Sequence, residues 1–178
     1  VSQICKLIKK ESFNKNLNNI IDIGCGLSFV NTILSKDFDD SMFYNLDKYD
    51  DKSEDYHGGY HNDAKNFKTR CDVKLTKQFH IDNNVDINRQ VYIDASNLEK
   101  IKDVKFDLII SIASWCFHYS FETYENIVKN NTTDSTIFVI RIRPEEKKNI
   151  LNKFKKYNFY ARVDKETNLV VLMKNNNE

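Results

Sequence analysis

Three acids and two glycines of this sequence stand where short apolar runs end. Asp22, Gly24 and Gly26 form a D-x-G-x-G pattern inside IIDIGCGLSF, and the chain has only four glycines. Asp47 closes the run MFYNLD, and Asp94 lies near the end of QVYIDA. Glycine permits unusual dihedrals and close approach of other groups, and carboxylates accept hydrogen bonds from hydroxyl and amino groups. If these runs are neighbouring strands, the pattern predicts a ligand-binding site.

The glycine pattern does not match two common phosphate-binding motifs. A dinucleotide fingerprint needs a third glycine where this chain has Phe29, and no G-K-[ST] follows as a P-loop requires. Asp47 can accept from a ribose diol, and Asp94, beside Ala95, can accept from an adenine amino group. The alternatives are a plain tight turn at the glycines, a solvated strand end at Asp47 and a helix cap at Asp94.

Strand-like and helix-like segments alternate along the chain. Strands are expected at 20–23, 42–47, 90–95, 105–114 and 135–143 and in a terminal hairpin of FYARVD and NLVVLMK. Helices are expected at 3–16, with Phe13 on the apolar face, after the glycines, at 63–82, with Leu75 and Phe79 on the apolar face, in ETYENIVKN and from Pro144 onward. This order predicts a single α/β domain over 1–178, with a doubly wound, mostly parallel sheet. Ligands of such sheets bind at the carboxyl ends of the strands, where the glycine turn lies.

The sequence resembles the class I S-adenosylmethionine-dependent methyltransferases. The matching stretches are DIGCG, the acid of YNLD, the IDA and FDLIIS strands and the hairpin, from about residue 3 to 174. The resemblance implies a Rossmann-like seven-stranded sheet with an antiparallel last strand, and S-adenosyl-L-methionine as cofactor. It places the methionine moiety near Asp22, Gly24, Cys25 and Gly26, the ribose on Asp47 and the adenine beside Asp94 and Ala95, and it adds Leu27, Lys48, Ser111 and Ala113 to the cofactor-binding residues.

The segment after the fourth strand faces the transferable methyl group in that family. The [DN]-P-P-[YF] motif of many amino-methylating enzymes is absent, because IASW stands in its register. The pattern SWCFHY followed by FETY is similar to short bacterial and phage methyltransferases of sugar or unknown small-molecule specificity. The resemblance therefore implies O-methylation of a small sugar-like acceptor.

His118 is the candidate general base for O-methylation, because an imidazole pKa near 6.5 suits that role. A structural histidine at the strand–helix junction is the alternative. The candidate substrate-binding residues are Ser114, Trp115, Tyr119 and Arg141 near this strand end, with His57, Tyr60 and His61 in a polar connection. The alternative for Trp115 is a place in the hydrophobic core. Arg141 and Arg143 could bind an anionic group or pair with Glu145 or Glu146.

The polar connection around 48–62 is expected to act as a mobile lid over the site. A merely solvated loop is the alternative. His57, His61 and Asp63 could hold a metal ion, but Gly58 and Gly59 interrupt any helix that would align the histidines, so we expect no metal.

Composition limits the function classes. The net charge is +1, which argues against a nucleic-acid partner, and no apolar run approaches the roughly 20 residues of a membrane span. The four cysteines are far apart and form no C-x-x-C, as in a reduced cytoplasmic protein. We therefore expect a cytoplasmic enzyme with a small-molecule acceptor. An RNA methyltransferase and a catalytically inactive cofactor-binding subunit are the other hypotheses.

Overall fold

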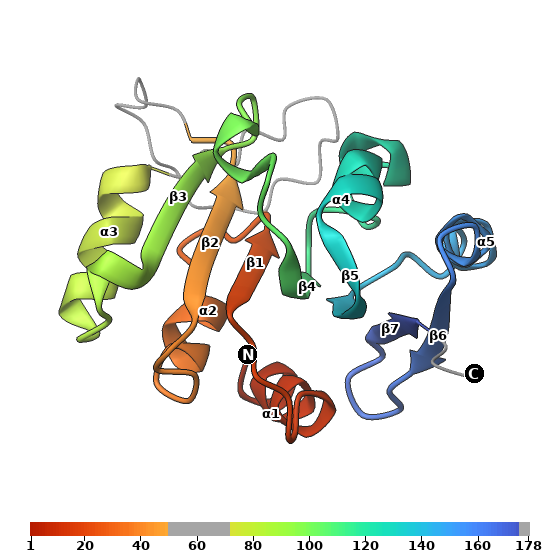
Figure 1. Cartoon of the computed structure of the whole chain (residues 1–178), viewed down its shortest axis with the longest axis horizontal. Helices are drawn as coiled ribbons and strands as arrows, with labels where there is room; N and C mark the ends of the chain where they lie inside the picture. Colours follow the sequence, from red (N-terminus) through yellow and green to blue (C-terminus); the bar gives the residue numbers. More distant parts are fainter. Residues whose placement is uncertain (50–71, 175–178) are drawn as a thin grey trace.

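A seven-stranded sheet forms the centre of the protein (Figure 1). The computed structural model describes residues 1–49 and 72–174. The strands are β1 (Asn19–Ile23), β2 (Met42–Asp47), β3 (Gln90–Asp94), β4 (Phe106–Ser111), β5 (Thr132–Ile140), β6 (Phe159–Val163) and β7 (Val170–Lys174). Their order is β3-β2-β1-β4-β5-β7-β6, and β7 is antiparallel to both of its neighbours. The predicted Rossmann-like, doubly wound sheet with an antiparallel last strand is confirmed.

Helices cover the two faces of this sheet. They are α1 (Ser2–Glu11), α2 (Phe29–Leu34), α3 (Val73–Asp82), α4 (Glu125–Asn130) and α5 (Lys147–Lys155), with single 3-10 turns η1 (Ile87–Arg89), η2 (Glu99–Ile101) and η3 (Phe121–Tyr124). Consecutive strand residues enter two separate cores, as the alternation of side chains in a strand requires. Ile20 and Phe43 pack with α1 and α2, whereas Ile21 and Tyr44 pack on the face of α4 and α5.

Several predicted elements are shorter in the structure. Helix α1 ends at Glu11, where Ser12 Oγ donates to the Ile8 carbonyl at 2.8 Å, and Phe13, predicted on its apolar face, is 77% exposed. Strand β5 ends at Ile140 rather than at residue 143. Arg141 consequently lies in the connection to α5. That helix begins three residues after Pro144, at Lys147.

Helix α3 packs through a different face from the predicted one. Residues 63–71 of the predicted helix lie outside the described residues. Leu75, predicted on the buried face, is exposed, whereas Thr76 and His80 are fully buried. Thr76 Oγ1 donates to the Asp72 carbonyl at 3.2 Å, and His80 Nδ1 lies 2.6 Å from the Tyr92 hydroxyl. The prediction of an apolar contact here is confirmed only at Phe79, whose half-buried ring meets the Phe29 ring edge-on with centroids 4.9 Å apart. The fully buried side chains of α3 instead contact a polar part of the structure.

That polar part is a buried network between α2 and strands β2 and β3. Asn45 Oδ1 accepts from Ser28 Oγ and, at 2.8 Å, from Asn31 Nδ2. Asn45 Nδ2 donates to Gln90 Oε1 at 3.0 Å. Among the described residues, the side-chain N and O atoms that are completely enclosed and have no hydrogen-bond partner are Asn31 Oδ1, Gln90 Nε2 and His80 Nε2. Amide and hydroxyl groups thus hold this part of the fold together.

We predict that His80 makes the protein less stable in acid. Burial lowers the pKa of His80 to about 4, below the value of about 6.5 in an unfolded chain. Between these values the unfolded chain binds a proton that the folded protein excludes, so the free energy of unfolding falls as the pH drops from about 6.5 to 4. The expected loss is about 2 kcal/mol. Urea unfolding of wild type and His80→Gln at a series of pH values isolates this contribution; equal pH dependence of the two proteins would contradict it.

Candidate active site

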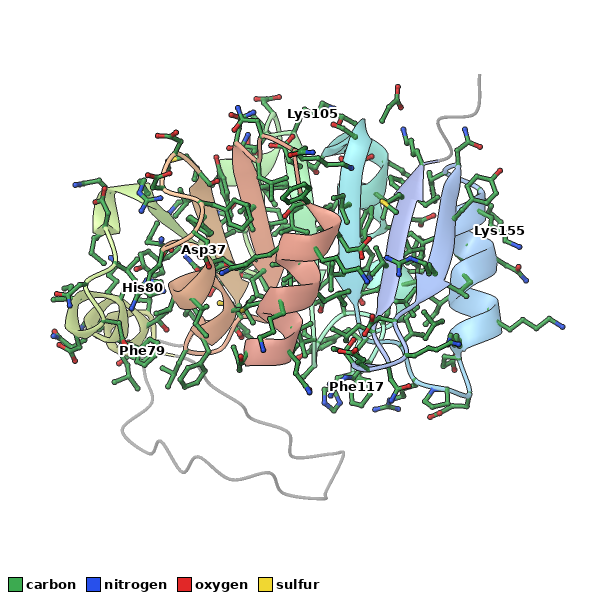
Figure 2. The ribbon with its side chains drawn as sticks, turned by 90° about the horizontal axis from the view of Figure 1, so that it is seen from below. Asp37, Phe79, His80, Lys105, Phe117 and Lys155 are labelled. Carbon is green, nitrogen blue, oxygen red and sulfur yellow. The ribbon has the colours of Figure 1, made fainter. Side chains whose placement is uncertain are left out.

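The predicted site residues gather at the carboxyl edge of the sheet. Lys105 and Phe117, which precede and follow β4, lie at opposite edges (Figure 2), so the carboxyl ends of the parallel strands share the edge of Phe117. Asp47 and Asp94 are register partners between β2 and β3. Asp22 lies between its register partners Asn45 and Ile110. The structure therefore brings the three predicted acids to one edge.

Gly24 is required because another segment packs directly against it. Its φ is +75°, and a Cβ there would overlap the side chain of Ser114 and lie 3.5 Å from the Ser114 Cα. The Gly24 amide donates to the Leu46 carbonyl at 2.7 Å, and the Cys25 amide donates to the same oxygen at 3.2 Å. The turn after β1 is thus fixed between the ends of β2 and β4. Ser114, predicted to bind substrate, is buried in this contact.

Gly26 has a different role in the same turn. Its φ is +56°, and no atom of residues 1–49 and 72–174 lies within 4 Å of the position a Cβ would take. The Gly26 amide donates to Asp47 Oδ2 at 2.7 Å. The glycine therefore serves the left-handed backbone conformation.

Asp47 is ordered by backbone amides and keeps acceptor capacity. Oδ2 accepts from Gly26, and Oδ1 accepts from the amide of Lys48 at 2.7 Å. Burial raises the pKa of Asp47, the two amides oppose that shift, and Asp94 adds to it. A carboxylate has about four lone-pair sites. Each oxygen of Asp47 can therefore accept a further hydrogen bond from a ligand.

Asp94 makes the local contacts expected of a turn residue. Its Oδ1 accepts from the Ser96 hydroxyl and, at 2.8 Å, from the Ser96 amide. Desolvation raises the pKa of Asp94, but these hydrogen bonds outweigh it, and the net shift is downward. The adjacent Ala95 amide donates to the Asp47 carbonyl at 2.9 Å. The capping role considered from the sequence is therefore present, and Asp94 Oδ2 still lies at the same edge as Asp47.

Asp22 is a buried carboxylate that lacks a compensating partner. It is only 4% exposed, and within residues 1–49 and 72–174 its side chain has no hydrogen bond or ion pair. Burial, and secondarily the charge of Asp47, raise the pKa of Asp22 to about 7. An unpaired buried carboxylate is unfavourable. A cationic ligand group, such as the ammonium of a methionine moiety, would compensate it, so these residues fit the implied cofactor.

Two residues that were predicted to contact a ligand make their contacts inside the protein instead. Ser111 Oγ donates to the Ile23 carbonyl at 2.9 Å and accepts from the Trp115 amide at 2.9 Å, so this fully buried side chain joins β1 to the turn after β4. Trp115 is 0% exposed, donates from Nε1 to the Phe121 carbonyl at 3.0 Å and packs against Phe154. Neither side chain reaches the surface of the site, so the structure gives no support to the assignment of Ser111 to the cofactor or of Trp115 to the substrate.

The remaining predicted site residues lie after β4, in the glycine turn, after β2 or outside the described part of the chain. Ala113, His118 and Tyr119 are exposed after β4, and Leu27 and Cys25 are half-buried in the glycine turn. Lys48 is exposed after β2. His57, Tyr60 and His61, and with them the predicted lid and the alternative metal site at Asp63, lie outside the described residues. In the ranges 1–49 and 72–174, no group of three potential metal ligands occurs.

His118 contacts Arg143, which the sequence predicted, together with Arg141, either to bind an anionic group or to pair with Glu145 or Glu146. Arg143 Nη2 lies 3.4 Å from His118 Nδ1, and the Arg143 guanidinium lies over the Phe117 ring, 5.5 Å from its centroid. Burial and the Arg143 charge lower the pKa of His118. The salt bridges of the described residues include none from Arg141 or Arg143 to Glu145 or Glu146. The spacing of the two arginines was the only sequence signal for this cluster.

We predict that the two glycines of the turn differ in their tolerance of a methyl group. Gly24→Ala introduces both a left-handed alanine and overlap with Ser114, so we expect a loss of about 3 kcal/mol or more of unfolding free energy. Gly26→Ala introduces only the backbone strain, about 1 kcal/mol. Urea denaturation of both variants checks the difference, and equal losses would show that the Ser114 contact does not constrain the turn.

Comparison with solved structures places this architecture among known folds. A precorrin-6y C5,15-methyltransferase from Geobacter metallireducens GS-15 matches with a TM-score of 0.62 and 12% identity, over 96% of this chain and 85% of that one. A methyltransferase from Pyrococcus furiosus matches at 0.59 and 12%, over 97% and 81%. An O-methyltransferase family protein from Burkholderia thailandensis matches at 0.64 and 8%, over 99% of this chain and 57% of that one.

The two comparisons at the level of sequence found no match. No family model matches the chain, and no curated protein matches it. None of the helices in the described ranges has the length and apolar character needed to cross a membrane.

Proposed function

We propose that this chain, which has the fold of the class I S-adenosylmethionine-dependent methyltransferases, transfers a methyl group to an oxygen of a small sugar-like acceptor. The observation that carries the proposal is the arrangement of Asp22, Gly26 and Asp47. A buried carboxylate with no partner among the described residues, a glycine turn and an ordered acceptor carboxylate lie side by side. These are the groups needed to hold an ammonium, a thioether chain and a ribose diol.

The cofactor would lie across the ends of β1, β2 and β3. Asp22 would pair with its ammonium group, and its methionine chain would lie along the glycine turn. Asp47 would accept from the ribose hydroxyls with the lone pairs that the backbone amides leave, and Asp94 and Ala95 would border the adenine. When bound, S-adenosylmethionine supplies an electrophilic methyl group.

The acceptor would lie on the segment that follows β4. Ala113 and Tyr119 are exposed there, and Ser114 holds this segment against the glycine turn. Proximity of this kind contributes a large share of the rate in a direct displacement, because it removes the entropy cost of bringing two reactants together. The proposed role of these residues is therefore to orient the acceptor hydroxyl.

The removal of Asp47 as an acceptor should weaken cofactor binding. Asp47→Asn keeps an oxygen for the Gly26 amide but replaces the other acceptor with a donor, so we expect a loss of about 1–3 kcal/mol in affinity for S-adenosylhomocysteine. Isothermal calorimetry measures it. Asp134→Asn, at an exposed acid near the start of β5, is the matched control. Undetectable binding by the wild-type chain would exclude the proposed function.

Cofactor affinity should also depend on pH through Asp22. Its pKa is raised to about 7, and only the ionised form pairs with an ammonium, so affinity should rise about tenfold from pH 6 to pH 8. Asp22→Asn should bind more weakly, with a flat profile over this range. A variant that kept the wild-type pH dependence would show that another group titrates.

The same variant should be more stable than wild type when no cofactor is present. A raised folded-state pKa means that the folded protein binds more protons than the unfolded chain between about 4 and 7, so ionised Asp22 destabilises the fold as the pH rises through that window. At pH 8 we expect Asp22→Asn to gain about 2 kcal/mol in unfolding free energy. A loss of stability would show that the carboxylate is compensated within the apoprotein.

An acceptor screen with methyl-labelled cofactor distinguishes the remaining hypotheses. Label transfer to a sugar-like hydroxyl supports the proposal. Transfer to RNA, with binding that weakens steeply with salt, would favour an RNA methyltransferase, and cofactor binding without transfer to any acceptor would favour an inactive accessory subunit.

A further inference from the structure

The two lateral margins of the sheet differ in how far other elements occupy them. Strands β3 and β6 are the outer strands (Figure 1). At β3, the Tyr92 carbonyl accepts from Lys100 Nζ at 3.4 Å, and the Tyr92 hydroxyl lies 2.6 Å from His80 Nδ1 of α3. Residues 160–163 of β6, by contrast, are all exposed. The accessible lateral margin of the sheet is therefore the one formed by β6.

The backbone of β6 directs hydrogen-bonding groups away from β7. The Asp164 amide donates to the carbonyl of Leu169, the residue that it faces when the register of β6 and β7 is continued. Hydrogen-bonded and non-hydrogen-bonded pairs alternate along antiparallel strands, so the amides and carbonyls of Phe159, Ala161 and Val163 point outward. In the described part of the chain, none of these groups has a partner. An outer strand of this kind can pair with a further strand.

Strand β6 lacks the features that commonly prevent such pairing, which are lysines, prolines, bulges or a covering element. Its sequence is FYARV, and its pairing with β7 is continuous. Its one charged residue is Arg162, whose Nη2 lies 2.5 Å from Glu11 Oε1, and the Glu11 side chain is only 8% exposed. The charge of Arg162 is thus neutralised by α1 and does not protect the margin.

The sequence of β6 is suited to pairing with a second copy of itself. In an antiparallel pair with a twofold axis at Ala161, Phe159 of one copy faces Val163 of the other, and Tyr160 faces Arg162. The outward residues then face one another, so every outward amide and carbonyl gains a partner. A shift by two residues leaves some of these groups unpaired, and a shift by one places them opposite groups already bonded to β7.

The side chains of β6 are compatible with this register. Tyr160 and Arg162 lie on the face of α1, where Arg162 contacts Glu11. They would form a non-hydrogen-bonded pair, which brings side chains closest together, so each tyrosine ring would meet a guanidinium already oriented by Glu11. Tyr160 is 49% exposed, and Phe13, two residues beyond Glu11, is 77% exposed. Exposed aromatic residues beside an unpaired strand are typical of a protein interface.

We propose that this chain forms a twofold-symmetric dimer in which β6 pairs with β6 of a second copy and the sheet continues through both subunits. In the strand order, β4, β5 and β7 separate β6 from the strands that carry Asp22, Asp47 and Asp94. The two candidate active sites therefore stay accessible in the dimer. The dimer rests on the fold and not on the proposed function.

Sedimentation equilibrium over a wide range of protein concentration tests the dimer in the full chain without cofactor. Wild type should show a reversible monomer–dimer equilibrium. Ala161→Pro removes an outward amide that makes no bond to β7, and proline is tolerated in outer strands, so the dimer dissociation constant should rise about tenfold or more. Ala161→Ser keeps the amide and is the matched control, with association close to that of wild type.

A pair of charge variants tests the identity of the partner and the register. Ala161→Lys and Ala161→Glu each place like charges directly opposite one another at the twofold axis, so each variant alone should be monomeric. An equimolar mixture should form a heterodimer, because opposite charges then meet at the axis. Circular dichroism of each variant shows whether the fold is retained.

Three results would overturn the dimer: wild type that stays monomeric at every concentration, Ala161→Pro that associates as strongly as wild type, or charge variants that each dimerise alone. The first result does not depend on how any variant folds, and it would instead assign the margin to an extended segment of a different protein. Failure of the proposed function is recognised separately, because it is read from S-adenosylhomocysteine calorimetry.

Discussion

The close packing of Ser114 on Gly24 is the contact on which the rest of the site depends. It leaves no room for a Cβ, and it brings the segment after β4 onto the turn after β1. Around it, the Leu46 carbonyl accepts from both Gly24 and Cys25, and Ser111 joins Ile23 to the backbone of Trp115. The ends of three strands are thus fixed to one another.

The site is assembled at a cost in local stability. Asp22 is buried with no partner among the described residues, and Ser28 in the same turn adopts a positive φ. Such features are unfavourable in isolation and are typical of functional positions. The compensation comes from the two apolar cores, which pack both faces of the strands that carry the turn. The sheet can therefore support a turn that is locally unfavourable.

The sequence predicted those parts of the fold that depend on the pattern of apolar residues alone. The strands, the order of the acids along them and the terminal hairpin follow from apolar runs and alternation, and the structure confirms the fold they predicted. The buried face of α3 could not be found in this way, because periodicity counts apolar residues and this helix docks through Thr76 and His80. For Trp115 and Ser111, the sequence indicates nearness to a strand end but not the direction of the side chain. Only the turn geometry after β4, with Cys116 at a φ of +63°, decides that both point inward.

The division of adjacent strand residues between two cores has an evolutionary consequence. Ile21 and Ile23 belong to one core, while Ile20 belongs to the other, and Asp22 shares its strand with all three. Insertion or deletion of a single residue in β1 would exchange the environments of these side chains and turn Asp22 toward the opposite face. Length changes are therefore expected to accumulate in the connections, whereas the lengths of β1 and β2 are held constant by both cores at once.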